Sequence, residues 1–132
     1  PEKIEFEITE TAIMQNIQSV IPVLHKIKAL GIKISIDDFG TGYSSMVYLK
    51  KLPIDTLKID REFIMELEKD EEDIAIVQAI MALSGALNLK TVAEGVEILE
   101  QKEILAKMGC DTFQGYYYSK PLDLKALLEF MA

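Results

Sequence analysis

The chain has 132 residues, of which 49% are apolar and 27% charged, and its 14 Lys and Arg against 22 Asp and Glu give a net charge of −8. This composition excludes a disordered chain, the acidity disfavours binding to duplex nucleic acid, and no apolar run reaches the ~18 residues of a membrane span. The single cysteine, Cys110, excludes an internal disulfide and a cysteine-rich metal site.

Five apolar runs of strand length recur along the chain, at residues 4–8, 32–36, 56–59, 90–93 and 112–116. Between and after them lie segments with helical spacing of apolar residues, at 13–27, 70–87, 96–108 and 122–131. Acidic residues open the second of these segments, and Gly31 and Gly109 follow the ends of the first and third, as helix capping favours. Alternating strands and helices predict βαβ connections and a parallel sheet.

Successive side chains of a strand point to opposite faces of the sheet. The parity of a position, odd or even along its run, therefore gives its face, and the polarity of the two faces distinguishes an open sheet from a barrel. Five units form either a small open sheet, which the length favours, or about five eighths of a (β/α)8 barrel of ~250 residues. One face of the runs is apolar, with Ile4, Phe6, Ile8, Ile34, Ile36, Leu57 and Ile59. The other face is largely polar, with Glu5, Glu7, Lys33, Ser35, Asp37, Lys58, Asp60, Val92, Glu94, Thr112 and Gln114. An open sheet covered on both sides would be apolar on both faces, so we predict an α/β fold, a partial TIM-type barrel of about five βα units.

Polar residues gather at the C-terminal ends of the runs, which converge on one mouth in a barrel. They are Glu7, Asp37, Asp38, Lys58, Asp60, Glu94 and Gln114. Several carboxylates in one cavity repel one another unless they are protonated or bridged by cations, so the pattern predicts a site for Mg²⁺ or Mn²⁺. If the chain bends at Asp37 and Asp38, each could serve a different ion of a two-metal phosphoester hydrolysis site. The structural alternatives are that Asp38 starts a turn and that Asp60 caps a helix beginning at Arg61.

The segment that follows, residues 39–45, contains two glycines and three aliphatic hydroxyls. A dinucleotide-binding fingerprint needs a further glycine where Ser45 stands, and the Walker Gly-Lys-Ser/Thr is absent. Asp38-Phe39-Gly40 spells the metal triplet of kinases, but the one histidine, His25, lies in a predicted helix and forms no His-Arg-Asp motif. Both nucleotide-binding interpretations are therefore excluded.

Ordered blocks of the sequence resemble the EAL-domain phosphodiesterases of bacterial signalling. The blocks are Glu7-Ile8-Thr9-Glu10-Thr11, Asp37 through Ser45, Leu52-Pro53-Ile54-Asp55 with Leu57-Lys58-Ile59-Asp60, Val92 through Glu97, and Gln114-Gly115-Tyr116 with Ser119-Lys120-Pro121. They cover essentially the whole chain. The resemblance implies a modified (β/α)8 barrel that hydrolyses cyclic di-GMP to linear pGpG with two Mg²⁺ or Mn²⁺ ions.

The resemblance also implies roles for individual residues. Glu7, Asp37 and Asp38 would be metal ligands, and Lys58, Glu94 and Asp38 would be catalytic. Glu10, Asp60 and Gln114 would support the site and anchor the loop. The loop of Phe39, Gly40, Thr41, Gly42, Tyr43, Ser44 and Ser45 would couple the metal site to dimerisation. Two positions depart from the family pattern: Met46 replaces a usual leucine, and Ile98 replaces a common threonine.

The family is named after a Glu-x-Leu motif near the start of its barrel, and the blocks matched by this chain begin downstream of it. We therefore expect residues 1–132 to be the C-terminal part of an EAL domain, with an incomplete two-metal site and little activity in isolation. The resemblance further implies a homodimer, a sensor or GGDEF-type domain in the parent protein, and a bacterial cytoplasmic site in a parent that is either soluble or membrane-tethered. The alternatives are a non-catalytic cyclic di-GMP receptor and a dimerisation or assembly module.

Overall fold

A computed structural model, which describes residues 1–41 and 46–132, contains one parallel five-stranded sheet in the order β1-β2-β3-β4-β5. The strands are β1 (Glu5–Thr9), β2 (Lys33–Phe39), β3 (Thr56–Ile59), β4 (Lys90–Glu94) and β5 (Thr112–Gln114). The helices are α1 (Glu10–Gln15), α2 (Ile17–Ala29), α3 (Met46–Lys51), α4 (Glu71–Ala86), α5 (Leu99–Lys107) and α6 (Leu124–Met131), with a 3₁₀ turn, η1, at Arg61–Phe63. The predicted α/β alternation is therefore confirmed.

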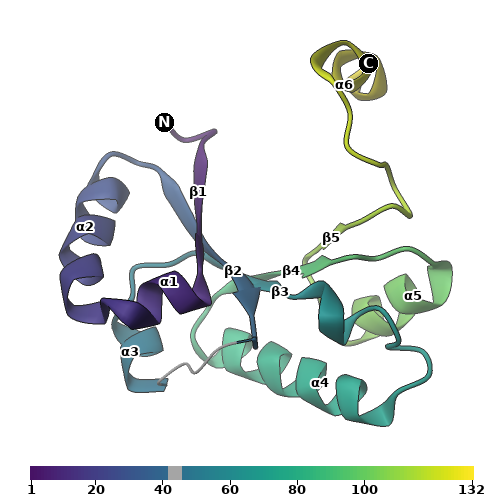
Figure 1. The fold of residues 1–132 in the computed structure, drawn as a ribbon, viewed down its shortest axis with the longest axis horizontal. Helices are drawn as coiled ribbons and strands as arrows, with labels where there is room; N and C mark the ends of the chain where they lie inside the picture. Colours follow the sequence, from purple (N-terminus) through teal and green to yellow (C-terminus); the bar gives the residue numbers. More distant parts are fainter. Residues whose placement is uncertain (42–45) are drawn as a thin grey trace.

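Helices α1 to α5 lie on the outer side of this curved sheet, whereas α6 projects beyond β5 and away from them (Figure 1). The covered face of β2 and β3 is fully buried, since Ile34, Ile36, Leu57 and Ile59 are each 0% exposed. These side chains form one core with buried apolar residues of the surrounding helices. The apolar face that parity predicts is confirmed for these two central strands.

The same prediction is wrong at the start of β1. Ile4, just before the strand, is 52% exposed and Phe6, within it, is 48% exposed, although both lie on the face that parity assigned to the core. The strand is at the edge of the sheet, and its first residues extend past the covering helices (Figure 1). Parity gives the face of a side chain, but burial also requires a neighbouring element on that face.

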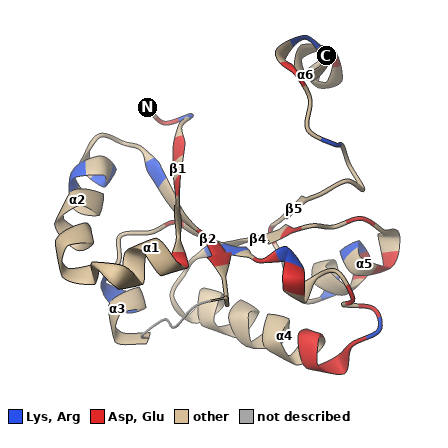
Figure 2. Cartoon of the chain, in the orientation of Figure 1, with Lys and Arg blue, Asp and Glu red and all other residues tan. Residues whose placement is uncertain are grey.

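The acidic entry to α4 shows why this long helix begins where it does. Asp70 is the N-cap residue, and its carboxylate accepts hydrogen bonds from the backbone N–H of Glu72 and Asp73. Acidic residues gather at this end of the helix (Figure 2), where the helix dipole stabilises negative charge. None of the described helices is both long and apolar enough to cross a membrane.

Several predicted boundaries differ from the structure: β5 ends at Gln114 and not at residue 116, the predicted segment 13–27 is divided into α1 and α2, and α6 begins at Leu124 and not at residue 122. Two further differences, in β2 and α5, have local reasons. Strand β2 continues to Phe39, past the predicted end at residue 36, through an irregularity described below. Helix α5 begins at Leu99 and not at Val96, because Gly95 has a φ of +79° and the Val96 N–H bonds to the carbonyl of Gln114. The Val96–Gln114 hydrogen bond thus connects the segment after β4 to β5 before α5 begins.

Candidate active site

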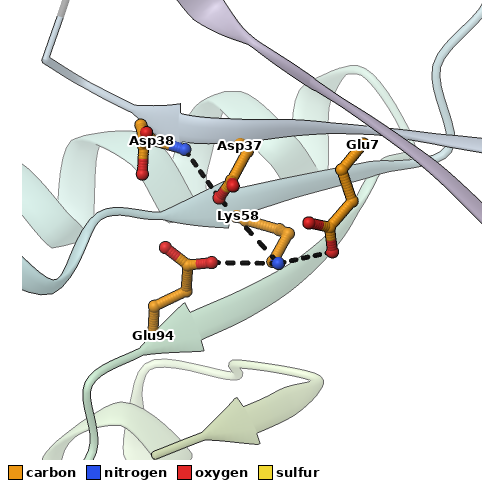
Figure 3. A network of polar contacts seen from close by, with 5 residues as sticks. All are labelled: Glu7, Asp37, Asp38, Lys58 and Glu94. Carbon is orange, nitrogen blue, oxygen red and sulfur yellow. Dashed lines mark hydrogen bonds and ion pairs between the residues drawn. The ribbon is translucent and has the colours of Figure 1, made fainter.

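Strands β1 to β4 bring four carboxylates together around one buried lysine, Lys58 (Figure 3). The Lys58 side chain is 5% exposed, and its Nζ lies 2.6 Å from Oε1 of Glu7 and 2.9 Å from Oε1 of Glu94. The third carboxylate, Asp37, lies 3.8 Å away through Oδ1. These residues belong to four different strands, so the parallel sheet assembles the cluster from distant parts of the sequence.

An irregularity in β2 turns two consecutive aspartates toward the same place. The register with β3 shifts between Ile36 and Phe39, and Asp38 has a φ of +54°. The Asp38 N–H donates a 2.9 Å hydrogen bond to Oδ1 of Asp37, which holds this turn of the backbone. As a result Asp37, Asp38 and Glu94 each offer one carboxylate oxygen, and these oxygens lie within 4.8 Å of one another. A regular strand would place consecutive side chains on opposite faces.

The electrostatics of the cluster favour the binding of cations. Burial raises the pKa of Glu94 to about 7, and the nearby Asp37 adds to this rise while Lys58 opposes it. Burial, a hydrogen bond with Asp60 and the charge of Asp37 also raise the pKa of Asp38. Burial acts to lower the pKa of Lys58, but hydrogen bonds with Glu7 and Glu94 outweigh it and leave the pKa raised. One ammonium therefore does not neutralise the carboxylates fully.

Asp60 fulfils the structural alternative that the sequence left open, because its carboxylate accepts a 3.0 Å hydrogen bond from Glu62 N–H as the N-cap of η1. The same carboxyl group acts on the pKa of Asp38. The cap is confirmed, and Asp60 also faces the site.

Glu10 is 1% exposed, and its Oε2 accepts a 2.8 Å hydrogen bond from the Gly40 N–H. This bond attaches α1 to the residue after β2, which is where the resemblance expects a loop anchor. Thr41 bonds back to the carbonyl of Asp38 through its hydroxyl. The remaining predicted loop residues, Gly42, Tyr43, Ser44 and Ser45, lie outside the described part of the chain.

Gln114 is brought beside the site by register alone. It pairs with Glu94 across β4 and β5, and it is exposed. Within residues 1–41 and 46–132 its side chain makes no hydrogen bond, so the supporting role that the resemblance implies for Gln114 stays a prediction.

Comparison with known proteins identifies the family. The model of the EAL domain matches residues 1–121. The chain belongs to the EAL domain family. It is 51% identical over 128 residues to the cyclic di-GMP phosphodiesterase NbdA of Pseudomonas aeruginosa, and 48% identical over 132 residues to the bifunctional diguanylate cyclase/cyclic di-GMP phosphodiesterase MucR of the same species. These matches cover 97% and 100% of this chain but 16% and 19% of the two relatives.

Solved EAL structures share the fold. The complex of the P. aeruginosa MucR phosphodiesterase with c-di-GMP superposes with a TM-score of 0.93 at 49% identity, over 96% of this chain and 51% of that one. The EAL domain of Mycobacterium smegmatis DcpA gives 0.90 at 42% identity, over 97% and 57%. A manganese and c-di-GMP complex of Klebsiella pneumoniae BlrP1 gives 0.84 at 34% identity, over 92% and 31%. The EAL chain described here is thus a partial barrel that spans about half of the first two structures.

Sequence reasoning missed part of the cavity that opens beside the carboxylates of this EAL chain. The cavity holds about 600 Å³ and is lined by Asp38, Thr41, Asp60, Arg61, Glu62, Met65 and Glu94. Among these described residues Arg61 is the one cation. It directly follows Asp60 in the sequence, and that adjacency was the available signal.

Proposed function

We propose that this chain supplies part of the active site of a cyclic di-GMP phosphodiesterase, which hydrolyses the cyclic dinucleotide to linear pGpG within an intact EAL domain. The observation that carries the proposal is the approach of Asp37, Asp38 and Glu94 to within 4.8 Å around the Lys58 network. The two P. aeruginosa relatives, both named as cyclic di-GMP phosphodiesterases, support the substrate.

The donor set fits hard divalent cations. Carboxylate oxygens are the ligands that Mg²⁺ and Mn²⁺ prefer, and burial together with neighbouring carboxylates raises the pKa values of Asp38 and Glu94, which supports a need for added positive charge. Glu7, Asp37, Asp38 and Glu94 would hold the ions. When bound, two such ions would supply a hydroxide and neutralise charge on the phosphodiester.

The chain's own residues would orient the reactants. The ammonium of Lys58 fixes the carboxylates of Glu7 and Glu94 and stays protonated at neutral pH because its pKa is raised. It would donate a hydrogen bond to the attacking oxygen. The carboxylate of Glu94, held 2.9 Å from Nζ of Lys58, would accept the proton of the water that adds to phosphorus. Arg61 in the adjoining cavity would pair with a phosphate oxygen of the dinucleotide.

The proposal is tested on the full-length protein by Mn²⁺ titration calorimetry and by chromatographic detection of pGpG. Asp37→Asn is expected to weaken Mn²⁺ binding at least ~10-fold and to abolish turnover, because it removes a charged ligand. The matched control, Glu100→Gln, changes an exposed carboxylate on α5 and should leave both unchanged. Equal Mn²⁺ affinity for Asp37→Asn and the control would remove Asp37 from the site.

The 132-residue chain alone should show little activity, since it spans about half of the first two matched structures and the resemblance implies that its two-metal site is incomplete. Formation of pGpG by these residues at the rate of an intact EAL domain would contradict this expectation.

A second candidate function is assembly with another copy. Strands β1 and β5 are the two ends of the sheet order, and the exposed Ile4 and Phe6 lie on one of these edges. Unpaired strand edges invite pairing with other chains. Analytical ultracentrifugation distinguishes the two functions, because a folded monomer at micromolar concentration would exclude assembly and leave the phosphodiesterase proposal intact.

A further inference from the structure

Gln101, in the first turn of α5, is a polar side chain that is almost completely buried, with 3% exposure. It lies outside the carboxylate cluster, and the catalytic chemistry proposed above does not use it. Burial of an amide is costly unless its hydrogen bonds are made. The contacts of this side chain therefore indicate what it does.

The Gln101 amide is fully satisfied, and its bonds reach two different loops. Its Oε1 accepts from the backbone N–H of Glu97 at 2.9 Å and of Ile98 at 3.4 Å. Its Nε2 donates to the carbonyl oxygen of Met65 at 3.1 Å and to Oε2 of Glu68 at 3.3 Å. The orientation of the amide is unambiguous, because a flip would place oxygen against two oxygens and nitrogen against two N–H groups.

The two loops that Gln101 joins are those that follow two residues of the site. Glu97 and Ile98 belong to the loop that leaves β4 directly after Glu94, and Met65 belongs to the segment that follows Asp60. Met65 also lines the 600 Å³ cavity together with Asp60 and Glu94.

A second contact shows how closely these loops approach each other. A Cβ placed on Gly95 would lie 2.6 Å from the Cβ of Arg61 and 3.3 Å from its Cα. The backbone after Glu94 therefore runs directly against the backbone after Asp60, with no space for a side chain between them. The hydrogen bonds of Gln101 join the same two segments.

From this geometry we infer that Gln101 is a positioning residue, which fixes the loop after Glu94 to the loop after Asp60 and thereby sets the shape of the cavity beside the carboxylates. The inference rests on the proposed function for its effect on turnover. The bridge itself does not depend on that function.

The two halves of the amide can be separated by substitution. In Gln101→Met both halves are lost. In Gln101→Glu the carboxylate still accepts from Glu97 and Ile98, but it cannot donate to Met65 and it repels Glu68. Adding Glu68→Gln to this variant returns an amide donor across the bridge. The matched control is Gln18→Met, which changes an exposed glutamine in the first turn of α2.

The first measurement is backbone hydrogen exchange of the full-length protein without metal. Gln101→Met and Gln101→Glu should both speed exchange about 10-fold or more in the segment around residues 62–69, and the double variant should reverse part of the effect of Gln101→Glu. Faster exchange confined to residues 97–101 in Gln101→Met, with Gln101→Glu like the unsubstituted protein, would overturn the inference, since Gln101 would then serve only as a helix cap.

The second measurement is turnover of cyclic di-GMP with Mn²⁺. Gln101→Glu should lower kcat about 10- to 100-fold with a smaller change in KM, as for other residues that orient metal ligands. Loosened loops with unchanged kcat would overturn the positioning role. If the unsubstituted protein forms no pGpG, the proposed function fails, and the exchange result alone then decides whether the bridge exists.

Discussion

Replacement of Lys58 by Met tests whether the carboxylate cluster depends on one buried cation. Methionine keeps the length of the apolar stem and removes the ammonium, so packing changes little while the charge is lost. The carboxylates of Glu7, Asp37 and Glu94 would then lose the ammonium that pairs with all three. In EDTA, where no divalent ion replaces it, the folded state should be less stable.

The size of this loss follows from the exposure of each partner. Lys58 and Glu94 are 5% and 15% exposed, and removal of one partner of a buried ion pair costs about 3–5 kcal/mol. Glu7 is 47% exposed, so its pair with Lys58 contributes under about 1 kcal/mol. Because the buried lysine also loses its own desolvation penalty, we expect a net loss of about 3 kcal/mol at pH 8.

The loss of stability in Lys58→Met should depend on pH, because protonation of Glu94 removes the charge that Lys58 neutralises. Its pKa is about 7 with Lys58 present and rises further without it, so at pH 5 the group is neutral in both proteins. The expected loss at pH 5 is then only about 1 kcal/mol. Urea unfolding at both pH values measures it, with Lys33→Met, an exposed lysine on β2, as the control. An equal loss at pH 5 and pH 8, or a loss no larger than the control, would refute this reasoning.

Three further predictions concern stability, each measured by urea unfolding. In EDTA the free energy of unfolding should fall as pH rises from 5 to 8, because Glu94 has a pKa of about 7 in the folded state against an ordinary 4.5. The fall should not exceed about 3 kcal/mol. Glu94→Gln should make the free energy of unfolding nearly independent of pH over this range. Gly40→Ala should lower the free energy of unfolding by about 1–3 kcal/mol, because Gly40 has a φ of +102° and a Cβ there would lie 2.6 Å from the Phe63 ring. Gly85→Ala in α4, where a Cβ would meet nothing within 4 Å, should raise it by up to about 1 kcal/mol. Equal effects of the two substitutions would contradict this reasoning. Ile98→Thr should stabilise the protein by about 1 kcal/mol, because Ile98 is the N-cap residue of α5 and a threonine hydroxyl would complete a capping box with Gln101. Ile98→Val has no hydroxyl and should give no such gain. An equal gain in both variants would contradict the capping explanation.

Side-chain parity predicted most of the fold, because in a parallel sheet the position of a residue along its strand determines which face it lies on and which residues of the neighbouring strands lie beside it. Alternation placed Glu7, Lys58 and Glu94 on one face, and parallel pairing brought the ends of their strands together. Both steps are local or topological rules, and neither requires knowledge of the packing. Burial at the sheet edge was not predictable in this way, as Ile4 shows, because it depends on which element covers the strand.

The approach of Asp38 to Asp37 lies beyond parity. It requires a residue with positive φ within a strand, a conformation that aspartate adopts more readily than most residues, and the Asp37 carboxylate stabilises it by accepting the Asp38 N–H. The sequence could show that a bend was needed if both aspartates were to bind cations. It could not show that the bend occurs inside the strand, with pairing to β3 resumed at Phe39.

Gln101 was not predictable because its partners lie far away along the chain. A glutamine at the third position of a helix is typical of an exposed capping residue, and half of its hydrogen bonds match that role. The other half reach Met65 and Glu68, more than thirty residues earlier, and bury the amide. Only the folded chain shows that one side chain serves two loops, and that a change at an ordinary helix cap should alter the cavity beside Glu94.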